Sequence, residues 1–362
     1  MFTVGEKHLY NIRLKELRQK IKRKKIDAFI VTGKANRTYL SGFTGSAGFL
    51  VVGSEKLLLV VDSRYTEQAK RQAPHAIIYP LKKSLSHTVN LITQKEGWEK
   101  LGFESEHIYY SAYRQLKDKV KSKLIPLEGI IENIRMIKDD YEIGIIKKAA
   151  KITDEALEEI KSYLVPGKKE SDIAAELDYI LKKNGGSGPS FDFIVASGER
   201  SSMPHGVASD KELKAGELIT IDCGTIYNGY VSDITRTFFL GKPGDKHREV
   251  RDIVRKAQLA SLKKIEAGAV AREVDRAARE VISEAGYGKY FGHGLGHGFG
   301  IEAHEYPRLS PKSKEKLAPG MMVTVEPGIY IPGWGGIRIE DMVLVKEKGY
   351  EILSTTPRNL LI

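Results

Sequence analysis

The chain contains the stretch Leu218-Ile-Thr-Ile-Asp-Cys-Gly-Thr-Ile-Tyr-Asn-Gly-Tyr-Val-Ser-Asp-Ile-Thr-Arg-Thr-Phe-Phe239, in which two apolar runs flank Asn228-Gly229. Asn-Gly between such runs is a strong signal for a β-hairpin with a two-residue turn. In the register that this turn sets, Asp222 faces Thr235. Because side chains alternate along a strand, Asp222 and Asp233 are predicted to share one face, with their backbones roughly 7–8 Å apart.

Two carboxylates at this distance can converge on one or two cations. The alternative is a solvated strand face that carries two surface aspartates. The flanking strands are too apolar for a surface edge, and burying an unpaired carboxylate pair is costly, so a cation is favoured. Cys223 points to the opposite face and is predicted to pack in the core rather than to bind metal.

A second stretch, Phe291-Gly-His-Gly-Leu-Gly-His-Gly-Phe-Gly-Ile-Glu-Ala-His-Glu305, gathers the histidines His293, His297 and His304. The glycines between them argue against a helix and permit close approach of the backbone to a ligand or a metal. The alternative is a glycine loop with incidental histidines.

Two further carboxylates, Glu326 and Glu340, lie in apolar stretches near the end of the chain. An ion pair with Arg338, two residues before Glu340, would account for one carboxylate but not for four. Together with a histidine, the four carboxylates suit a pair of Mn, Co, Fe or Zn ions better than a thiolate zinc site or calcium. Two such ions about 3.5–4 Å apart can activate water and polarise a carbonyl group.

The length of 362 residues suggests two domains, which we place at residues 1–133 and 134–362. The single cysteine rules out an intramolecular disulfide and a multi-cysteine metal site, and a reducing cytoplasm is the expected compartment. No run approaches the ~18 apolar residues of a membrane span, and no signal peptide is visible. We therefore expect no membrane association.

The net charge of +11 lies entirely in the first third, since residues 1–133 hold 24 Lys and Arg against 13 Asp and Glu. Such an excess can indicate a nucleic-acid surface. The densest cluster, residues 20–25, instead overlies Leu14, Leu17 and Ile21 at helical spacing, which is typical of a solvated helix face. We therefore expect no nucleic-acid partner.

The two regions differ in their expected elements. Short apolar runs at 28–32, 49–52 and 57–62 predict strands in the first, with helices at 10–25 and 64–72 and a loop at 36–48. The second predicts helix pairs at 139–165 with 171–184, where Ser171 caps the second helix, and at 249–267 with 270–286. Strands are expected between the pairs and after residue 320.

The order Asp, Asp, His, Glu, Glu resembles the metallopeptidase family with the pita-bread fold, which includes methionine aminopeptidases, Xaa-Pro aminopeptidases and Xaa-Pro dipeptidases. The surrounding segments Ser232-Asp-Ile-Thr-Arg-Thr237, His293-Gly-Leu-Gly-His297, Glu326-Pro-Gly-Ile-Tyr330 and Arg338-Ile-Glu-Asp341 match too. The segments Tyr39-Leu-Ser-Gly-Phe-Thr-Gly45 and 195–209, with the preceding domain, resemble the proline-specific branch.

The resemblance implies an α/β two-domain protein. Its N-terminal α/β domain, of the creatinase/prolidase N-terminal type, would have a mixed sheet. Its C-terminal pita-bread α+β domain would have two helix pairs around a curved antiparallel sheet. Two divalent metal ions would be bound by Asp222, Asp233, His297, Glu326 and Glu340.

The resemblance also implies further roles. Glu326 would act as general base, and His205 and His304 would bind the substrate and the developing oxyanion. His293 would line the proline pocket, with Tyr330 as a candidate for its wall. Arg338 would orient Glu340 and lie near the carboxyl side of the substrate.

The main hypothesis is a homodimeric exopeptidase that releases the N-terminal residue from Xaa-Pro peptides by attack of a metal-bridging hydroxide. Manganese is the expected metal, with cobalt, zinc or iron as alternatives. A dipeptidase restricted to Xaa-Pro dipeptides is the rival within this class, although the segment 43–48 favours the aminopeptidase. A non-catalytic scaffold that binds RNA or protein is a remote alternative, against which the intact set of ligands argues.

Overall fold

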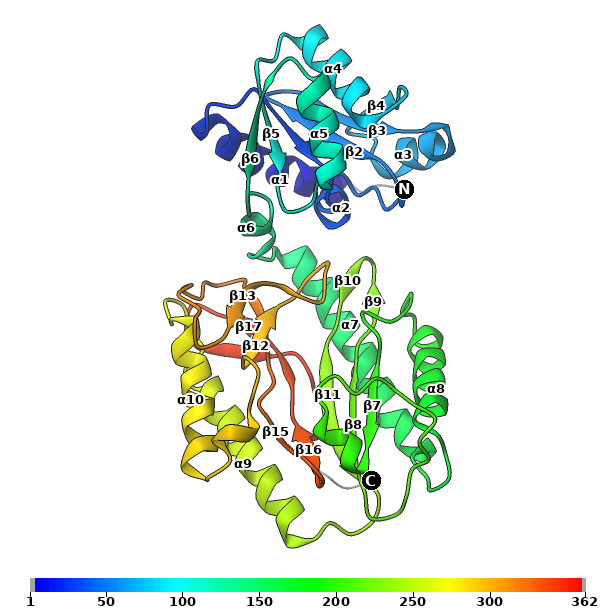
Figure 1. The fold of residues 1–362 in the computed structure, drawn as a ribbon, viewed down its shortest axis with the longest axis vertical. Helices are drawn as coiled ribbons and strands as arrows, with labels where there is room; N and C mark the ends of the chain where they lie inside the picture. Colours follow the sequence, from blue (N-terminus) through cyan, green and yellow to red (C-terminus); the bar gives the residue numbers. More distant parts are fainter. Residues whose placement is uncertain (1–3, 360–362) are drawn as a thin grey trace. The chain divides into compact units, whose positions relative to one another are not determined.

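The computed structural model describes residues 4–359, which divide between Arg135 and Met136 into two compact units. Figure 1 shows each unit with its own sheets and helices. No helix in the described range is both long and apolar enough to cross a membrane.

The N-terminal unit is built on a six-stranded sheet of order β4-β3-β2-β1-β5-β6. β1 is antiparallel to β2 and parallel to β5, so the expected mixed sheet is confirmed. Residues of β1, β2 and β3 are buried throughout, as expected for strands covered on both faces. The strands are β1 (Ala28–Val31), β2 (Phe49–Gly53), β3 (Leu57–Val61), β4 (Ile77–Pro80), β5 (Lys100–Glu104) and β6 (Lys123–Leu127).

The helices of this unit cover the sheet and carry their own termination signals. In α4, Ser84 caps the first turn by accepting from the backbone N–H of His87, and Gly97 ends the helix in the left-handed conformation. The helices are α1 (Val4–Arg23), α2 (Lys34–Ser41), α3 (Thr66–Gln72), α4 (Leu85–Glu96), α5 (Tyr110–Lys119) and α6 (Glu132–Arg135), with a 3₁₀ turn at Ser63–Tyr65.

The expected loop at 36–48 is wrong in its first half, because Lys34–Ser41 forms the helix α2. Tyr39 and Leu40 are buried on this helix, and Gly42 ends it at φ 73°. Burial of this apolar face outweighs the polar composition of the segment, which the sequence prediction weighted more heavily.

The C-terminal unit contains the two expected helix pairs. α7 (Asp140–Glu159) begins with a capping box between Asp139 and Glu142, and a 3₁₀ turn follows it at Ile160–Tyr163. Ser171 is not the N-cap of the next helix, since α8 (Glu170–Lys183) already begins at Glu170. The second pair is α9 (Asp245–Leu262) with α10 (Ala271–Glu284).

The strands of this unit are antiparallel, as predicted, but they are divided among several sheets. A three-stranded sheet has the order β11-β8-β7, and a five-stranded sheet has the order β13-β12-β14-β17-β18. The three-stranded sheet and its hairpin comprise β7 (Ile194–Ser197), β8 (Leu218–Cys223), β9 (Ile226–Tyr227), β10 (Tyr230–Val231) and β11 (Ile234–Phe239). The remaining strands are β12 (Gly296–Gly298), β13 (Glu305–Leu309), β14 (Met322–Val325), β15 (Gly328–Ile331), β16 (Gly335–Arg338), β17 (Asp341–Val345) and β18 (Tyr350–Ile352).

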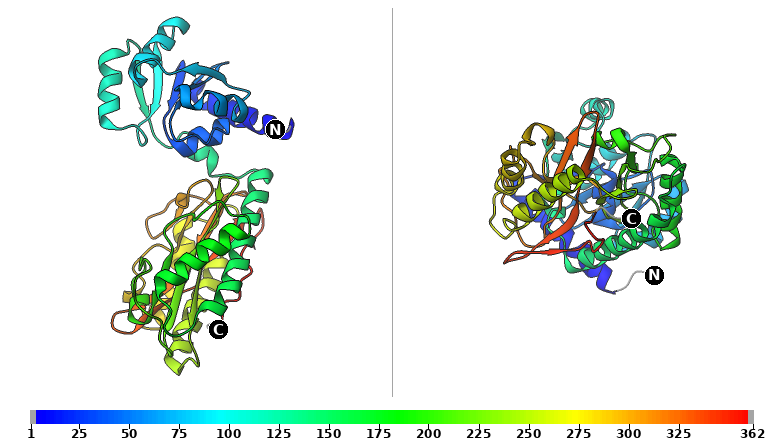
Figure 2. Two further views of the ribbon diagram at one scale, coloured as in Figure 1. Left: turned by 90° about the vertical axis from the view of Figure 1, so that its right-hand side faces the viewer. Right: turned by 90° about the horizontal axis from the view of Figure 1, so that it is seen from below.

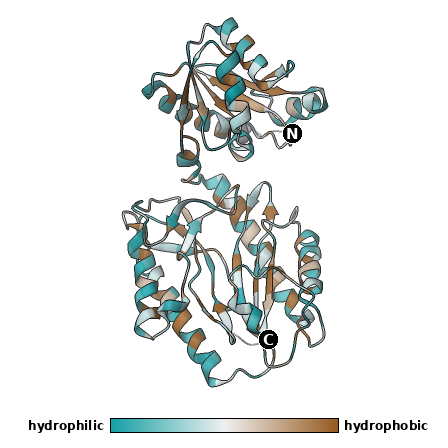
Figure 3. Ribbon diagram, in the orientation of Figure 1, coloured by the Kyte–Doolittle hydropathy of each residue, from teal (hydrophilic) through white to brown (hydrophobic). Residues whose placement is uncertain are grey.

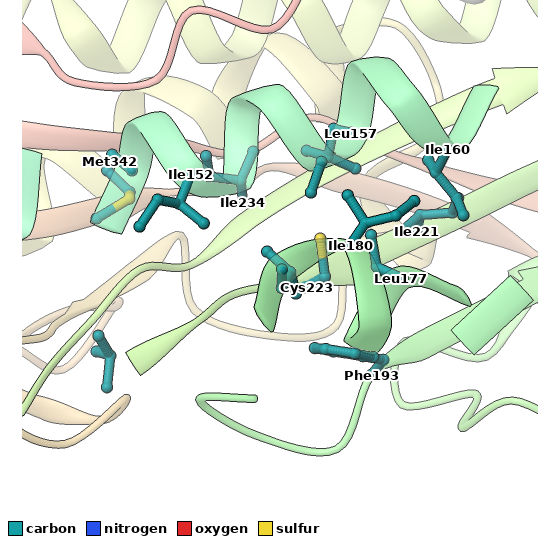
Figure 4. Packing of buried hydrophobic residues seen from close by; sticks show 14 of the residues in the cluster. Ile152, Leu157, Ile160, Leu177, Ile180, Phe193, Ile221, Cys223, Ile234 and Met342 are labelled. Atoms are coloured by element: carbon teal, nitrogen blue, oxygen red, sulfur yellow. The ribbon is translucent and has the colours of Figure 1, made fainter. Parts of the chain in front are cut away.

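Two hydrophobic cores join these sheets to the helix pairs. One packs α7 and α8 against β7, β8 and β11, and the second packs α9 and α10 against β14, β15, β16 and β17. Figure 2 shows α7 and α8 together over the strands. Figure 3 shows hydrophobic residues concentrated along these strands. Cys223 is fully buried in the first core, as predicted (Figure 4).

The hairpin register is confirmed. Tyr227 pairs with Tyr230 across the turn, and Asp222 pairs with Thr235. Asn228 and Gly229 have φ values of 46° and 83°, as a type I′ turn requires. The same register holds on both sides of the irregular segment around Asp233, so no bulge separates the two aspartates.

Candidate metal centre

Five polar side chains from five parts of the C-terminal unit line one cavity of about 600 Å³. They come from β8, the link between β10 and β11, β12, the end of β14, and the link between β16 and β17. These side chains are Asp222, Asp233, His297, Glu326 and Glu340. All five residues that the resemblance suggested as ligands are therefore brought together.

His297 lies between carboxylates. Its Nε2 is 3.6 Å from Oδ2 of Asp233 and 3.4 Å from Oε1 of Glu326. Its Nδ1 lies 3.0 Å from the carbonyl oxygen of Gly298. A proton on Nδ1 donated to this carbonyl leaves the Nε2 lone pair directed at the carboxylates, the arrangement that a metal ligand needs.

Threonine hydroxyls hold the two glutamates. Oγ1 of Thr235 donates to Oε2 of Glu340 at 2.6 Å, and Oγ1 of Thr324 donates to Oε1 of Glu326 at 3.2 Å. Thr235 also stands opposite Asp222 in the β-ladder. These contacts orient the carboxylates within the cavity.

The charges of these carboxylates oppose one another. Burial, and then the charge of Glu340, raises the pKa of Asp233 well above its ordinary value. Burial raises the pKa of Glu326 to about 8, and the charge of Asp222 adds to this increase against the opposing effect of Arg338. Burial and the charge of Glu326 likewise raise the pKa of Glu340. The protein by itself does not supply enough positive charge to keep all these groups ionised.

The pKa of Asp341 is shifted in the opposite direction from those of these three cavity carboxylates. It follows Glu340 directly and is equally buried. Burial acts to raise its pKa, but Arg236 and Arg358 outweigh that effect and lower the pKa. The three cavity carboxylates are therefore about as buried as Asp341 but have fewer positively charged side chains beside them.

The donor set fits divalent metal ions. One ligand atom each of Asp233, His297 and Glu340 lies within 4.8 Å of the others. Oδ1 of Asp222 is buried and has no hydrogen-bond partner among the described residues, although its neighbour Oδ2 accepts from Arg338. Carboxylate oxygens with one imidazole suit Mn, Co, Fe or Zn, and an unpaired buried oxygen is costly unless a ligand satisfies it.

The other predicted residues fall at different depths. His205, His293, His304 and Arg338 line the cavity, whereas Tyr330 does not. The Tyr330 hydroxyl lies behind the lining, 2.9 Å from Nε2 of His293 and 3.0 Å from Nη1 of Arg338. Arg338 pairs with Asp222 at 2.6 Å and contacts Glu340 only through Thr235.

His293 and His304 lie in an environment that favours their neutral form. Burial and then the charge of Arg338 lower the pKa of His293 to about 4. Burial and the neighbouring His297 also lower the pKa of His304, whose ring lies 4.2 Å from that of His297 between centroids. Neutral imidazoles at this wall leave its surface suited to an uncharged substrate group.

The glycines around His297 serve sheet packing rather than approach to a ligand. A Cβ on Gly296 would lie 2.0 Å from the carbonyl oxygen of Thr324, and one on Gly298 would lie 2.2 Å from that of Tyr306. We expected these glycines to bring the backbone close to a ligand or metal. In the structure they instead bring β12 close to β14 and β13.

Sequence reasoning missed several residues of the site. Thr235 could have been found, because the hairpin register already places it opposite Asp222. The cavity lining also includes Phe191, Asp192, Arg308 and Ser310, which no motif distinguished. Arg308 pairs with His297 across β12 and β13, so both side chains project from the same face of the sheet.

Comparison with known families now identifies the chain. Residues 144–347 match the model of metallopeptidase family M24. The chain belongs to this family. The expected fold and the expected metal-dependent peptidase are confirmed by this membership, and residues 13–137 match the creatinase/prolidase N-terminal domain.

Relatives of this M24 peptidase include both proline-specific types. The Xaa-Pro dipeptidase of Pyrococcus horikoshii is 40% identical over 98% of this chain and 99% of its own length. The structure of the Xaa-Pro dipeptidase from Bacillus anthracis has a TM-score of 0.95 and 43% identity, covering 98% of this chain and 100% of that one. The X-Pro aminopeptidase from Thermotoga maritima has a TM-score of 0.89 and 39% identity, covering 95% and 100%.

Proposed function

We propose that this M24 peptidase hydrolyses the Xaa-Pro bond and that dipeptides are its preferred substrates. The observation that carries the proposal is the convergence of four carboxylates and His297 in one cavity. The Xaa-Pro dipeptidases among its relatives support the substrate class. They favour the dipeptidase, the alternative in the sequence analysis, over the broader aminopeptidase.

The proposed cofactor is a pair of divalent ions, with manganese as the first candidate and cobalt, zinc or iron as alternatives. Their ligands would be Asp222, Asp233, His297, Glu326 and Glu340. Bound ions of this kind lower the pKa of water and polarise the scissile carbonyl group.

Other steps of the reaction, proton transfer and oxyanion binding, are assigned to side chains of the cavity. Glu326 accepts a proton from the attacking water and returns it to the departing proline nitrogen, while Thr324 holds its Oε1. His205 and His304 donate hydrogen bonds to the oxygen of the scissile carbonyl, where negative charge develops.

His293 provides the wall for the proline ring. Its Nδ1 lies 2.7 Å from the Gly294 carbonyl oxygen, and Tyr330 contacts its Nε2. The ring is therefore fixed and, with its lowered pKa, neutral. Arg338 lines the cavity beside this wall, donates to Tyr330 and Asp222, and faces the carboxyl side of the substrate.

Arg308 favours dipeptides. The charge of Arg338 is balanced by Asp222, whereas Arg308 makes no ion pair with a carboxylate in the described part of the chain. A Xaa-Pro dipeptide places a free carboxylate directly after proline, where a guanidinium can bind it. A longer peptide places a neutral amide at that position.

The test compares Ala-Pro with Ala-Pro-Ala, using metal-stripped protein to which Mn²⁺, Co²⁺ or Zn²⁺ is restored. We expect metal-dependent cleavage of Ala-Pro, with a much higher kcat/KM than for Ala-Pro-Ala. Cleavage should be lost in Asp233→Asn and retained in the control Asp178→Asn. Equal or faster cleavage of Ala-Pro-Ala before proline would establish the aminopeptidase. Absence of metal-dependent cleavage of both would contradict the proposal and favour a scaffold.

Two further expectations belong to this proposal. We propose a homodimer, which sedimentation equilibrium would test, because the resemblance implies one. We also propose a cytoplasmic location, which the single, fully buried cysteine supports. Fractionation of source cells with an antibody would test it.

A further inference from the structure

The segment Ser354–Arg358, which follows β18, packs beside the start of β17, the strand that begins directly after Glu340. Ser354 and Thr356 are buried, and the segment lies outside the residues that line the cavity. No motif in the sequence distinguished it. Its polar contacts converge on Arg236 and Asp341.

Asp341 receives an unusual number of donors for a fully buried carboxylate. Nε of Arg358 donates to Oδ2 at 2.7 Å and its Nη2 to Oδ1 at 2.9 Å. Ser354 donates to Oδ1 at 2.7 Å, Arg236 to Oδ1 at 2.9 Å and Gln258 to Oδ2 at 3.0 Å. The segment thus supplies three of these hydrogen bonds.

Arg236 extends these contacts to the metal centre. Its side chain is only 1% exposed. Nε and Nη2 donate to the carbonyl oxygen of Thr356 at 3.1 and 2.8 Å, and Nη1 donates to the carbonyl oxygens of Thr235 and Glu340. One guanidinium therefore joins the segment to the backbone of both residues.

The segment is itself anchored to α7. Asp154 accepts from the backbone N–H of Thr355 at 2.7 Å and of Thr356 at 2.8 Å, and from both hydroxyl groups. These contacts fix Thr356, whose carbonyl oxygen Arg236 binds. The path from α7 to Glu340 is continuous.

Glu340 is held at both polar groups of its backbone and at one oxygen of its side chain. Its N–H donates to the carbonyl oxygen of Thr235 at 3.1 Å, its carbonyl oxygen accepts from Arg236, and its Oε2 accepts from Thr235 Oγ1. A ligand attached to the link between two strands depends on such contacts for its orientation. Outer contacts of this kind typically change metal affinity about 10–100-fold when removed.

We propose that Ser354–Arg358 positions Glu340 for metal binding, acting through Asp341 and Arg236. This inference rests on the proposed function, in which Glu340 is a metal ligand. Arg236, Asp341 and Arg358 are positioning residues, because they lie outside the cavity lining. Their removal should weaken metal binding while the fold is still intact.

The test measures Mn²⁺ binding to the metal-stripped full chain by isothermal titration calorimetry. We expect Arg358→Gln to raise the Kd of at least one Mn²⁺ ion about 10–100-fold. Arg358→Lys retains the charge but not the two-point contact, so we expect an intermediate Kd. Near-UV circular dichroism at the same temperature shows whether each variant has native packing.

The matched control is Arg200→Gln. Arg200 pairs with the fully buried Glu170 and is 25% exposed, compared with 20% for Arg358 beside the fully buried Asp341. Arg200 does not touch the segment or Glu340, so its loss should lower stability without changing the Kd for Mn²⁺. Equal weakening in both variants would indicate a general loss of structure and overturn the inference.

A folded Arg358→Gln protein that binds Mn²⁺ like the wild type would also overturn it. If Arg358→Gln does not fold, Ser354→Ala decides, because it removes only the 2.7 Å hydrogen bond to Asp341 and the contact from the Met342 N–H. We expect a smaller rise in Kd, and an unchanged Kd would count against the inference. A wild type that binds no Mn²⁺ would overturn the proposed function itself.

Discussion

Arg338 and Asp222 form a buried ion pair, with Nη2 of the arginine 2.6 Å from Oδ2 of the aspartate. The arginine side chain is 3% exposed, so this pair is largely shielded from water. It neutralises one of the four carboxylates of the cavity. The second oxygen of Asp222 has no hydrogen-bond partner in the described chain and is available to a metal ion.

Replacing Arg338 by Met should destabilise the metal-free protein more than the metal-loaded protein. Removal of one partner from a buried pair typically costs about 3–5 kcal/mol, because the other charge is left uncompensated. Bound Mn²⁺ would compensate Asp222 in part. Thermal unfolding with and without Mn²⁺ measures the difference, and an equal loss of Tm in both states would contradict the prediction.

The change Tyr330→Phe should impair proline binding. It removes the hydroxyl group that lies within hydrogen-bond distance of His293 and Arg338 and leaves the ring in place. A loss of about 1 kcal/mol is expected for such contacts, or roughly fivefold in kcat/KM. The loss should appear mainly in KM for Ala-Pro. Tyr179→Phe, at an exposed tyrosine, is the control and should leave both constants unchanged.

The substitution Gly296→Ala should weaken Mn²⁺ binding. Its Cβ would lie 2.0 Å from the Thr324 carbonyl oxygen, so β12 must shift and carry His297 with it. Calorimetric titration with Mn²⁺ measures the effect. Gly144→Ala in α7 is the control, because its added Cβ meets no atom within 4 Å beyond the neighbouring helix backbone, and it should preserve binding and add about 0.5–1 kcal/mol of stability. Unchanged binding in Gly296→Ala would show that β12 tolerates the shift.

Acid should destabilise the N-terminal unit through Glu132. Burial acts to raise its pKa, but hydrogen bonds from His107 and Asn36 together outweigh burial and lower the pKa to about 2 from 4.5. The folded state therefore binds this proton less readily than the unfolded state. The resulting stability is present above pH 4.5 and is lost as the pH falls toward 2. Glu104 acts oppositely, because burial raises its pKa.

Unfolding by urea between pH 2 and 5 tests this prediction. The chain has two tryptophans, and Trp98 reports on the N-terminal unit once Trp334→Phe removes the second signal. Glu132→Gln in this background should lower the free energy of unfolding at pH 5, and the difference should vanish near pH 2. Glu128→Gln, at an exposed position, is the control. A difference that is constant over this pH range would contradict the assigned pKa.

Local signals in the sequence determined the hairpin, and the family motifs suggested the candidate metal ligands. Asn228-Gly229 sets a turn whose geometry places Asp222 opposite Thr235, and strand alternation then determines which side chains share a face. The mixed first sheet and the two helix pairs also agree with apolar periodicity and family resemblance. These features depend on neighbours along the chain, or on motifs that retain their spacing.

Only the tertiary structure decided which groups meet across long separations. It paired Arg338 with Asp222, 116 residues away, although the sequence suggested Glu340. It formed α2 where composition indicated a loop, because burial of Leu40 and its neighbours stabilises the helix. It also brought Thr355 to Asp154, 201 residues away. Such contacts arise from packing, since burial selects partners for polar groups only after the strands and helices have been assembled.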